Sequence, residues 1–426
     1  MSTSSRSHLL QSYPPDLDDY EGLYKHFHAH PEVSLQESDT ASTIADHRAL
    51  SAYTVHTSIG GNGVAGVLHN GAGPTILLRA DMDALFVKEE TGLEYASHAK
   101  MTDDADGSEK SVMHACGHDM HITCLLAAAD WLARKEVREK WGGTLVVVFQ
   151  PNEERGEGAK AMVDGGLYEK VPVPDVVFGQ HVMPLKTGKV AVKNGTTVAA
   201  ADSFKITLFG RGGHGSMPHL CIDPVVLAAN VIVRLQGVVA REVDPQEPAV
   251  LTVGSVQAGQ TENVIADQAV LKVDIRSQDG ATRERVLKAM RRIVEKECEA
   301  SGCEKPPSFE QTRRFPLTVN DTDVTTKLSQ AFQETFGEEF DPDVATSNAS
   351  EDFSDLARSV NKPYCFWFIG GVDGEKWEKA KSEDRIAEDI PANHSGLFAP
   401  VVQPTLKTGV ETLCVAALTF LGSKEA

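Results

Sequence analysis

The segment TLVVVFQPNEE, at residues 144–154, predicts a buried strand that ends in two acids. Residues 144–150 are mostly apolar and β-branched, which favours a strand covered on both faces, and Pro151 ends the run. Neighbouring side chains on an extended backbone point to opposite sides, so Glu153 and Glu154 can serve two tasks, one as a metal ligand and one as a general base. A solvated turn is the alternative that this segment alone leaves open.

Two further apolar strands also end in polar residues. Residues 75–78 (TILL) precede an arginine and then Asp81 and Asp83, and residues 176–180 (VVFGQ) precede His181. In open α/β sheets, sites form outside the carboxyl ends of the strands. We expect the two acids to orient metal-bound histidines or to adjust the pKa of a general base. Charge pairing with the neighbouring arginine is the structural alternative.

Residues 114–121 (HACGHDMH) concentrate thiol, imidazole and carboxylate groups. Zinc and related metals bind thiolate and imidazole, and a tight turn at Gly117 would let Cys116 and His118 approach an ion from one loop. The alternative is a His-rich helix N-terminus in which Asp119 caps the apolar helix that follows.

A last candidate ligand stands far downstream, in a loop that contains Asn393, His394 and Ser395. Any one of the chain's histidines, taken singly, is as often a structural residue as a ligand. Strand ends in an α/β sheet nevertheless bring distant segments together. The predicted five-ligand set is Cys116, His118, Glu154, His181 and His394.

Composition limits the partners and the compartment. The formal net charge of −20 and the pI near 5.2 argue against a nucleic-acid or anionic-membrane partner, because proteins that bind either one carry basic surfaces. The seven cysteines are odd in number and show no repeating spacing, so a disulfide framework is not expected. The first twenty residues lack the apolar core of a signal peptide, and the sequence shows no long apolar run. We therefore expect a cytoplasmic protein with no membrane partner.

The order of the expected elements predicts an α/β fold with an insertion. Helical patterns at 17–30 and 119–136 alternate with short apolar strands, which predicts a mixed, largely parallel sheet with helices on both faces. Residues 203–300 instead read strand, helix, strand, strand, helix, which is an α+β, ferredoxin-like order. We predict a first domain made of residues 1–200 and 309–426, with a second domain inserted at 201–308.

The inserted segment carries candidate residues of its own. His214 stands in the glycine-rich stretch GRGGHGSMPH at 210–219, and such a loop can bring an imidazole close to a ligand. Asn263 and Arg276 lie at the ends of expected strands, and a guanidinium suits a carboxylate through its bidentate fork. A flexible turn and a solvated arginine are the alternatives.

Taken in order, these segments resemble the M20 metallopeptidase family, most closely its aminoacylase and amidohydrolase branch, which includes hippurate hydrolases and auxin-conjugate amidohydrolases. The thiolate in HACGHD separates this branch from M20 peptidases that bridge their metals with an aspartate. The matching stretches, which run along nearly the whole chain, are HAHPEVSLQE (28–37), RADMDAL (79–85), HACGHDMH (114–121), QPNEERGEGA (150–159), GQHV (179–182), GRGGHGSMPH (210–219), ENVIAD (262–267), SEDFS (350–354) and NHSGLF (393–398).

The resemblance implies roles for individual residues. It implies that the five-ligand set binds two divalent metals, zinc or manganese, with nickel or cobalt as further options. Glu153 is then the general base, with Asp83 beside it in the catalytic site. The resemblance also implies that the inserted domain is a lid and dimerisation domain, that His214 reaches the active site of the partner subunit to hold the substrate or the oxyanion, and that Asn263 and Arg276 hold the substrate carboxylate.

Three positions depart from the family pattern. Asn152 stands where alanine is usual, Ala266 where proline is usual, and Ala349 where glycine usually precedes Ser350. None of them removes a ligand, so they bear on the choice of substrate.

The function implied is metal-dependent hydrolysis of the amide bond of N-acyl amino acids by a homodimer, as in aminoacylases and hippurate hydrolases. Glu153 would take a proton from the attacking water and return it to the leaving amine. A dipeptidase or metallo-carboxypeptidase of the same family is the alternative. A non-catalytic binding protein would be expected to lack a ligand or the base, and all six residues are present.

Overall fold

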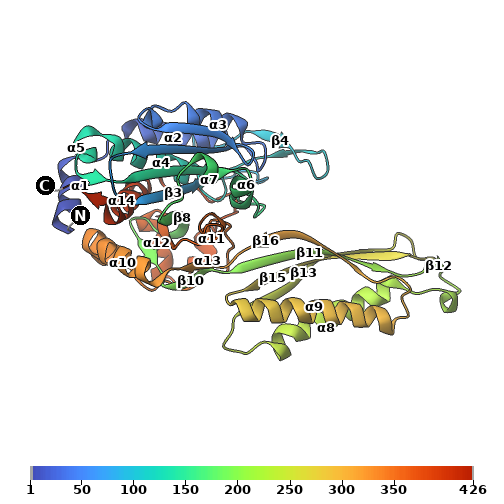
Figure 1. Cartoon of the computed structure of the whole chain (residues 1–426). Helices are drawn as coiled ribbons and strands as arrows, with labels where there is room; N and C mark the ends of the chain where they lie inside the picture. Colours follow the sequence, from blue (N-terminus) through green and yellow to red (C-terminus); the bar gives the residue numbers. More distant parts are fainter. Residues whose placement is uncertain (1–2, 425–426) are drawn as a thin grey trace. The chain divides into compact units, whose positions relative to one another are not determined.

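The computed structural model describes residues 3–424, which form two compact units (Figure 1). The first unit comprises the chain up to Thr197, Val319–Ala345, and the chain from Asp352 onward. The second comprises Val198–Thr318 and the short segment Thr346–Glu351. The first unit is therefore discontinuous in sequence.

An eight-stranded mixed sheet forms the centre of the first unit. Its four middle strands run parallel to one another, as the predicted largely parallel sheet requires, and antiparallel pairs flank them. The strand order is β1 (Thr54–Ile59), β2 (Gly63–His69), β7 (Thr144–Gln150), β3 (Thr75–Asp81), β8 (Val176–Lys186), β19 (Tyr364–Val372), β9 (Val190–Val192) and β18 (Phe340–Asp341).

Side chains of β3 alternate between the two faces of this sheet. Ile76 and Leu78 pack into the main core, which also contains α2 (Asp18–Ala29), α4 (His118–Ala133), α10 (Thr322–Phe336) and α14 (Val402–Phe420). Arg79 points to the opposite face, toward Asp352, which precedes α11 (Ser354–Arg358). The predicted α/β architecture is confirmed.

The turn before α4 requires a glycine. Gly117, the residue before the first helical position, has a φ of 84°, in the left-handed region that residues with a Cβ rarely adopt. A Cβ at this position would also lie 2.4 Å from Cγ1 of Val182 on β8. Backbone of the Cys116–His118 turn therefore packs directly against β8, which fixes the start of α4 relative to the sheet.

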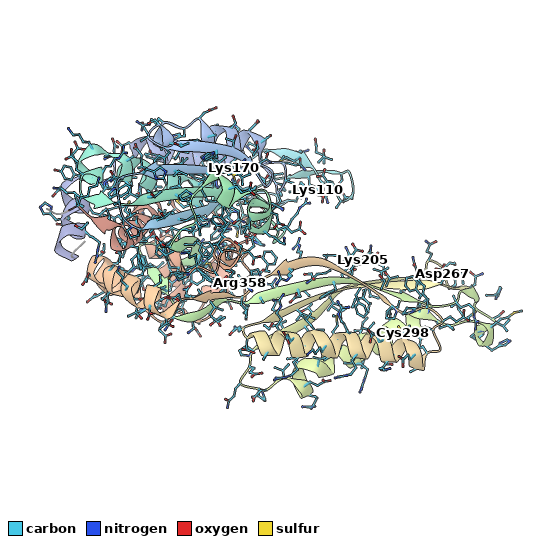
Figure 2. The ribbon with its side chains drawn as sticks, in the orientation of Figure 1. Lys110, Lys170, Lys205, Asp267, Cys298 and Arg358 are labelled. Carbon is cyan, nitrogen blue, oxygen red and sulfur yellow. The ribbon has the colours of Figure 1, made fainter. Side chains whose placement is uncertain are left out.

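The second unit is a four-stranded antiparallel sheet with two helices. The strand order is β13 (Ala249–Ala258), β15 (Gln268–Ser277), β11 (Ala200–Phe209) and β16 (Ser308–Phe315), and α8 (Pro224–Glu242) and α9 (Gly280–Ala300) complete a βαββαβ order typical of ferredoxin-like folds. Figure 2 labels Cys298 on α9, which is buried against the sheet, and Lys205 on β11, which alternates with the buried Phe204.

The sequence pattern does not predict β16. Its residues, SFEQTRRF, are mostly polar and exposed, so they lack the apolar alternation of a half-buried strand, yet they pair with β11. This strand extends the second unit beyond residue 308.

Among the described residues, one helix, α8, is long and apolar enough by length and composition to cross a membrane. One side of α8 is buried in the core of the second unit, through residues that include Leu227, Val231 and Leu235. Val226 and Val233 on its other side are 57% and 72% exposed. The exposed side of the helix therefore carries apolar residues that the described chain does not cover.

Candidate metal centre

The carboxyl ends of three parallel strands and the start of α4 surround one group of polar side chains in the first unit. β3 ends at Asp81, β7 is followed by Glu153 and Glu154, and β8 carries His181. Cys116 and His118 lie at the start of α4, and the backbone N–H of His394 donates to the carbonyl of Ala115 at 2.8 Å. The five predicted ligands therefore lie on segments that meet at one edge of the sheet.

Short distances connect these five side chains. The ligand atoms of Cys116, His118 and Glu154 all lie within 4.8 Å of one another. Cys116 Sγ lies 3.4 Å from His181 Nε2, and His394 Nε2 lies 3.4 Å from Glu154 Oε1. Thiolate, imidazole and carboxylate together form a donor set that suits zinc and similar divalent metals.

Unpartnered atoms within this cluster fit a metal. His118 Nε2 and Glu154 Oε1 are buried and make no hydrogen bond among the residues that the structure describes. Buried polar atoms normally find a partner. Burial also holds the pKa of His181 well below its usual range, with a further contribution from His121, so this ring is in the neutral form that binds metals.

Asp83 contacts both the loop of the predicted base, Glu153, and the predicted ligand His118. Its two carboxylate oxygens accept the backbone N–H groups of Glu153, at 3.1 Å, and Glu154, at 3.0 Å. The same carboxylate lies 3.4 Å from His118 Nδ1 and accepts a hydrogen bond from Ser34. Asp83 thus fixes the loop that carries the predicted base and orients the ring of a predicted ligand.

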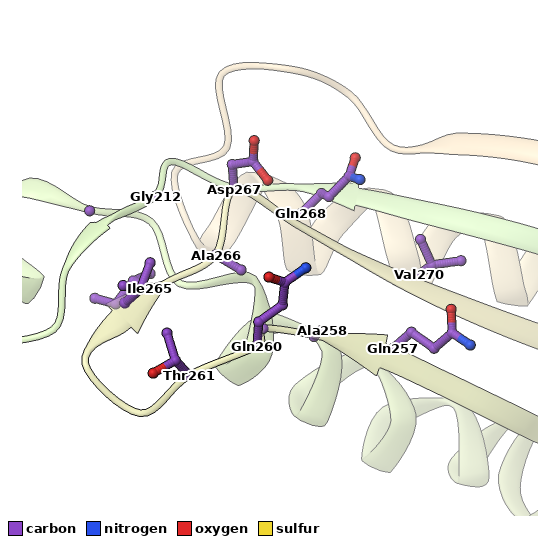
Figure 3. A pocket seen from close by; sticks show the side chains of 13 residues that line it. Gly212, Gln257, Ala258, Gln260, Thr261, Ile265, Ala266, Asp267, Gln268 and Val270 are labelled. Atoms are coloured by element: carbon purple, nitrogen blue, oxygen red, sulfur yellow. The ribbon is translucent and has the colours of Figure 1, made fainter.

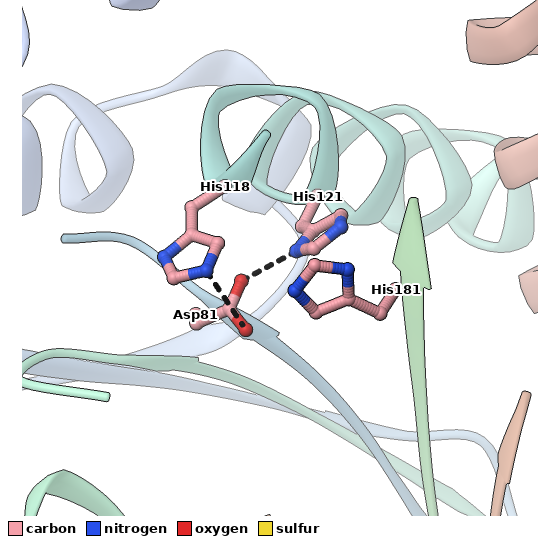
Figure 4. A group of neighbouring side chains, drawn as sticks. All are labelled: Asp81, His118, His121 and His181. Atoms are coloured by element: carbon pink, nitrogen blue, oxygen red, sulfur yellow. Dashed lines mark hydrogen bonds and ion pairs between the residues drawn. The ribbon is translucent and has the colours of Figure 1, made fainter. Parts of the chain in front are cut away.

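Asp81 makes the charge pair that the sequence left open. Arg79 donates to its carboxylate at 2.6 Å, and both side chains are buried. Burial alone would raise the pKa of Asp81, but Arg79, His118 and His121 together hold it well below its usual range. Asp81 is therefore an ionised carboxylate, and it acts both in the charge pair and beside the histidines of the cluster (Figure 4).

The turn that carries the predicted base has a left-handed residue. Asn152 has a φ of 56°, a conformation that asparagine adopts more readily than alanine. Its backbone N–H donates to the buried Glu37 at 2.8 Å. Burial, and then the charge of Asp83, raise the pKa of Glu37 to about 7. Glu153, which follows Asn152 in this turn, is 5% exposed, so its side chain lies in a buried position.

A second buried ion cluster supports the start of α4. His28 Nδ1 lies 2.6 Å from Asp119 Oδ2 and its Nε2 lies 3.0 Å from Glu89 Oε1. Burial alone would lower the pKa of His28, but hydrogen bonds to Asp119 and Glu89 raise it to about 10. Gly117 occupies the N-cap position of α4, and Asp119 lies in the first turn, where its carboxylate also accepts the backbone N–H of Met120 at 2.9 Å.

His28 and His121 were not assigned roles from the sequence. Both lie in stretches that the family resemblance covers, and His121 lies one helical turn after His118, so spacing alone could have indicated that their rings are neighbours. The ring centroids of His118 and His121 are 5.5 Å apart.

The three predicted substrate-binding residues belong to the second unit, which brings two of them together. His214 in β12 (Gly213–His214) pairs with Val264 in β14 (Val264–Ile265), next to Asn263. A cavity of about 700 Å³ lies beside these strands, lined by residues that include Gly213, Val264 and Gln260 (Figure 3). The Ser216 backbone N–H donates to His214 Nδ1 at 3.1 Å, so the proton of the neutral ring is on Nε2.

Arg276 lies apart from this pair. It stands near the end of β15, whereas His214 and Asn263 lie near the strand's beginning. Its guanidinium donates to Asp274 at 3.0 Å and to the carbonyl of Asn348 at 2.7 Å. The arginine is thus held in place, at the opposite end of the sheet from the histidine.

Comparison with known proteins agrees with this geometry. The model for peptidase family M20/M25/M40 matches residues 77–393. Hippurate hydrolase of Campylobacter jejuni is 38% identical over 353 residues, which are 82% of this chain and 87% of that protein. IAA-amino acid hydrolase ILR1-like 4 of Arabidopsis thaliana is 33% identical over 352 residues, 82% of this chain and 76% of that protein.

A solved structure extends the match to the fold. The Bacillus subtilis YXEP protein, described as a dinuclear metal binding peptidase from the M20 family, has a TM-score of 0.72 at 26% identity and covers 94% of this chain and 98% of its own. The chain belongs to the M20 metallopeptidase family, a family of hydrolases, and within it to the amidohydrolase branch.

Proposed function

We propose that this protein hydrolyses the amide bond of N-acyl amino acids and releases a carboxylic acid and an amino acid. One observation carries the proposal, namely that Cys116, His118 and Glu154 present ligand atoms within 4.8 Å of one another, next to the buried Glu153. The relatives named above support the substrate class, because hippurate and IAA-amino acid conjugates both join an acyl group to an amino acid through an amide.

The five-ligand set would hold two divalent metals, zinc or manganese, with nickel or cobalt as further options. When bound, such metals lower the pKa of a water and polarise a carbonyl oxygen. Glu153 takes the proton from the attacking water and returns it to the leaving amine. Asp83 keeps Glu153 in place because its carboxylate accepts the backbone N–H of Glu153.

His214 is proposed as a donor to the oxyanion. The proton on its Nε2 points away from the bond to Ser216, and a neutral N–H stabilises developing negative charge. Asn263 lies beside it, and we assign the substrate carboxylate to Asn263 and Arg276.

We further propose a homodimer through the second unit. β14, with which His214 pairs, precedes the start of β15 at Gln268, and Arg276 lies eight residues further along β15, which is about 27 Å at about 3.4 Å per residue. A small substrate that contacts both residues must therefore receive one from each of two copies. The exposed Val226 and Val233 on α8 support this interface, since contiguous apolar surface marks sites of association.

All seven cysteines are free, and Cys116 must stay reduced to act as a ligand. This cysteine usage supports a cytoplasmic location.

A substrate screen tests the proposal. Metal-free protein is loaded separately with zinc, manganese, cobalt and nickel, and release of free amino acid is measured from N-benzoyl, N-acetyl and indoleacetyl amino acids. The same acyl amino acids with an amidated carboxyl group serve as matched controls for recognition of the carboxylate. Hydrolysis of the free acids but not the amides is expected, and no hydrolysis of any acyl amino acid with any metal would refute the proposal.

The second candidate is a dipeptidase or metallo-carboxypeptidase of the same family. Dipeptides and N-blocked longer peptides in the same screen separate these activities. Preference for a free amino terminus would indicate a dipeptidase. Release of a C-terminal residue from longer peptides would indicate a carboxypeptidase.

A further inference from the structure

His121 lies in a group of residues that could, by type, hold a metal. Ligand atoms of Asp81, His118, His121 and His181 lie within 4.8 Å of one another, and the rings of His121 and His181 are 4.6 Å apart between centroids (Figure 4). Residue type alone would therefore add His121 to the metal ligands.

The hydrogen bonds of His121 exclude this role. Its Nε2 accepts the backbone N–H of Val182 at 2.8 Å, and a backbone N–H can only donate. Nε2 must therefore use its lone pair in this bond, and the proton of the neutral ring is on Nδ1. Nδ1 in turn donates to Asp81 Oδ1 at 2.5 Å. Both nitrogens are occupied, and no lone pair is left for a metal.

A buried series of hydrogen bonds holds Asp81, the partner of His121, in place. Arg79 donates to Asp81 at 2.6 Å and to Gln150 at 2.8 Å, and Gln150 donates to Asp352 at 2.6 Å. Asp81, Gln150 and Asp352 are fully buried and Arg79 is 1% exposed. Asp81 therefore has one oxygen held by Arg79 and offers the other to His121.

Val182, whose backbone N–H His121 holds, also orients His181 through its carbonyl. Val182 follows His181 directly, and its carbonyl accepts a hydrogen bond from His181 Nδ1 at 2.8 Å. The lone pair of His181 is consequently on Nε2, the nitrogen that lies 3.4 Å from Cys116 Sγ. Asn393, from the loop of His394, donates to the same Val182 carbonyl at 3.2 Å.

We infer that His121 is a positioning residue, which sets the orientation of His181 for metal binding by holding the backbone N–H of Val182. The order of contacts is Asp81, His121, Val182, His181. His121 contacts neither the substrate nor the metals. This inference rests on the proposed metal centre and adds to it the reason why a fourth imidazole, beside the three of the ligand set, is needed there.

Three substitutions of His121 separate positioning from ligation and from packing. His121→Asn can donate to Asp81 from the position of Nδ1 but is too short to reach Val182. His121→Gln places an amide oxygen near the position of Nε2 and can still accept the Val182 N–H. His121→Phe keeps the ring but makes neither hydrogen bond.

Binding of zinc to the metal-free proteins, measured by calorimetry, is the first readout. His121→Asn and His121→Phe should lower the affinity for one of two zinc equivalents by about 10–100-fold, as for other residues that orient a ligand, while His121→Gln stays close to wild type. Unchanged binding by His121→Phe would show that the ring only fills space and would overturn the inference. If His121→Gln loses one zinc equivalent to the same extent as His121→Asn, His121 would be a metal ligand, and this result would also overturn the inference.

A second readout uses the wild-type protein, so it does not depend on whether the variants fold. Nitrogen NMR of histidine-labelled protein should show His121 with a proton on Nδ1 and a hydrogen-bonded, unprotonated Nε2, unchanged when zinc is added, while His181 shifts. If a nitrogen resonance of His121 shifts to the value of a metal-bound nitrogen, this inference is overturned but the proposed metal centre is not. Wild-type protein that binds no metal overturns the proposed centre itself, so the two failures are distinct.

Discussion

The carboxylate of Asp83 accepts the backbone N–H of Glu153 at 3.1 Å. Asp83, which follows β3, thus holds Glu153, the first acid of the loop after β7. The contact is with the main chain of Glu153. The side chain of Glu153 takes no part in this bond, so a change to that side chain leaves its anchor intact.

Glu153→Gln should abolish most of the activity without loss of metal. The amide keeps the size of the side chain and the backbone bond to Asp83, but it cannot accept a proton from water. A loss of about 10²–10⁴-fold in kcat is expected for removal of a general base. Steady-state kinetics and elemental analysis of the same preparation check this, and turnover within a few-fold of wild type would show that another group is the base.

Cys116→Ser should lower the metal content of the purified protein. A hydroxyl is a weak substitute for a thiolate that the metals themselves keep deprotonated. Cys124→Ser is the matched control, because Cys124 lies within α4, is fully buried, and donates to the carbonyl of Leu406. Elemental analysis after dialysis should show loss in the first variant alone. Equal metal content in both variants would make Cys116 a structural thiol.

Mixed dimers should recover activity that neither parent shows. His214→Ala and Glu153→Gln are each expected to be nearly inactive, but a dimer with one copy of each contains one site in which both residues are intact. Activity should rise after the two proteins are mixed under conditions that exchange subunits. If exchange is demonstrated by differently tagged chains and activity stays absent, His214 acts within its own chain or has no catalytic role.

The stability of the protein should fall between pH 6.5 and about 10 because of His28. Its pKa is raised from 6.5 to about 10 by Asp119 and Glu89, against the effect of burial, so the folded state binds a proton that the unfolded state releases over this range. The stabilisation from the charged ring is complete below pH 6.5 and is lost as the pH rises through about 10. Urea unfolding across this range measures the loss.

His28→Gln has no charge to lose, so its stability should depend less on pH over the same window. The difference from wild type should be on the order of a few kcal/mol at pH 6.5, at about 1.4 kcal/mol per pKa unit, and should shrink toward pH 10. The exposed His30→Gln is the control and should follow the wild-type curve. A constant difference across the window would mean that His28 is not charged in the folded protein.

The sequence predicted the fold and the candidate ligands where local pattern carries the information. Runs such as residues 144–150 are strands because their apolar residues are continuous, and polar residues that follow such strands collect at one edge of a parallel sheet. Glu153, Glu154 and His181 could be chosen on that ground alone.

What the sequence did not reveal depends on contacts between segments far apart in the chain. The bond between His121 and Val182 joins a helix to a strand 61 residues later, and His28 meets Asp119 across 91 residues. The local pattern around His121 or His28 does not say which distant residue its ring will contact. Strand β16 escaped prediction for a related reason, since its polar residues form a strand only because β11 offers an edge to pair with.

The backbone bond from His394 to Ala115 has a consequence for how the protein is made. Segments that are synthesised early hold four of the proposed ligands, Cys116, His118, Glu154 and His181, but the fifth, His394, follows the inserted unit in the sequence. Domains generally fold during synthesis from the N-terminal end, so we expect the segments that carry these four residues to form before the loop of His394 reaches Ala115. We therefore expect the proposed five-ligand set to be completed only late in synthesis, because His394 follows the inserted unit in the sequence.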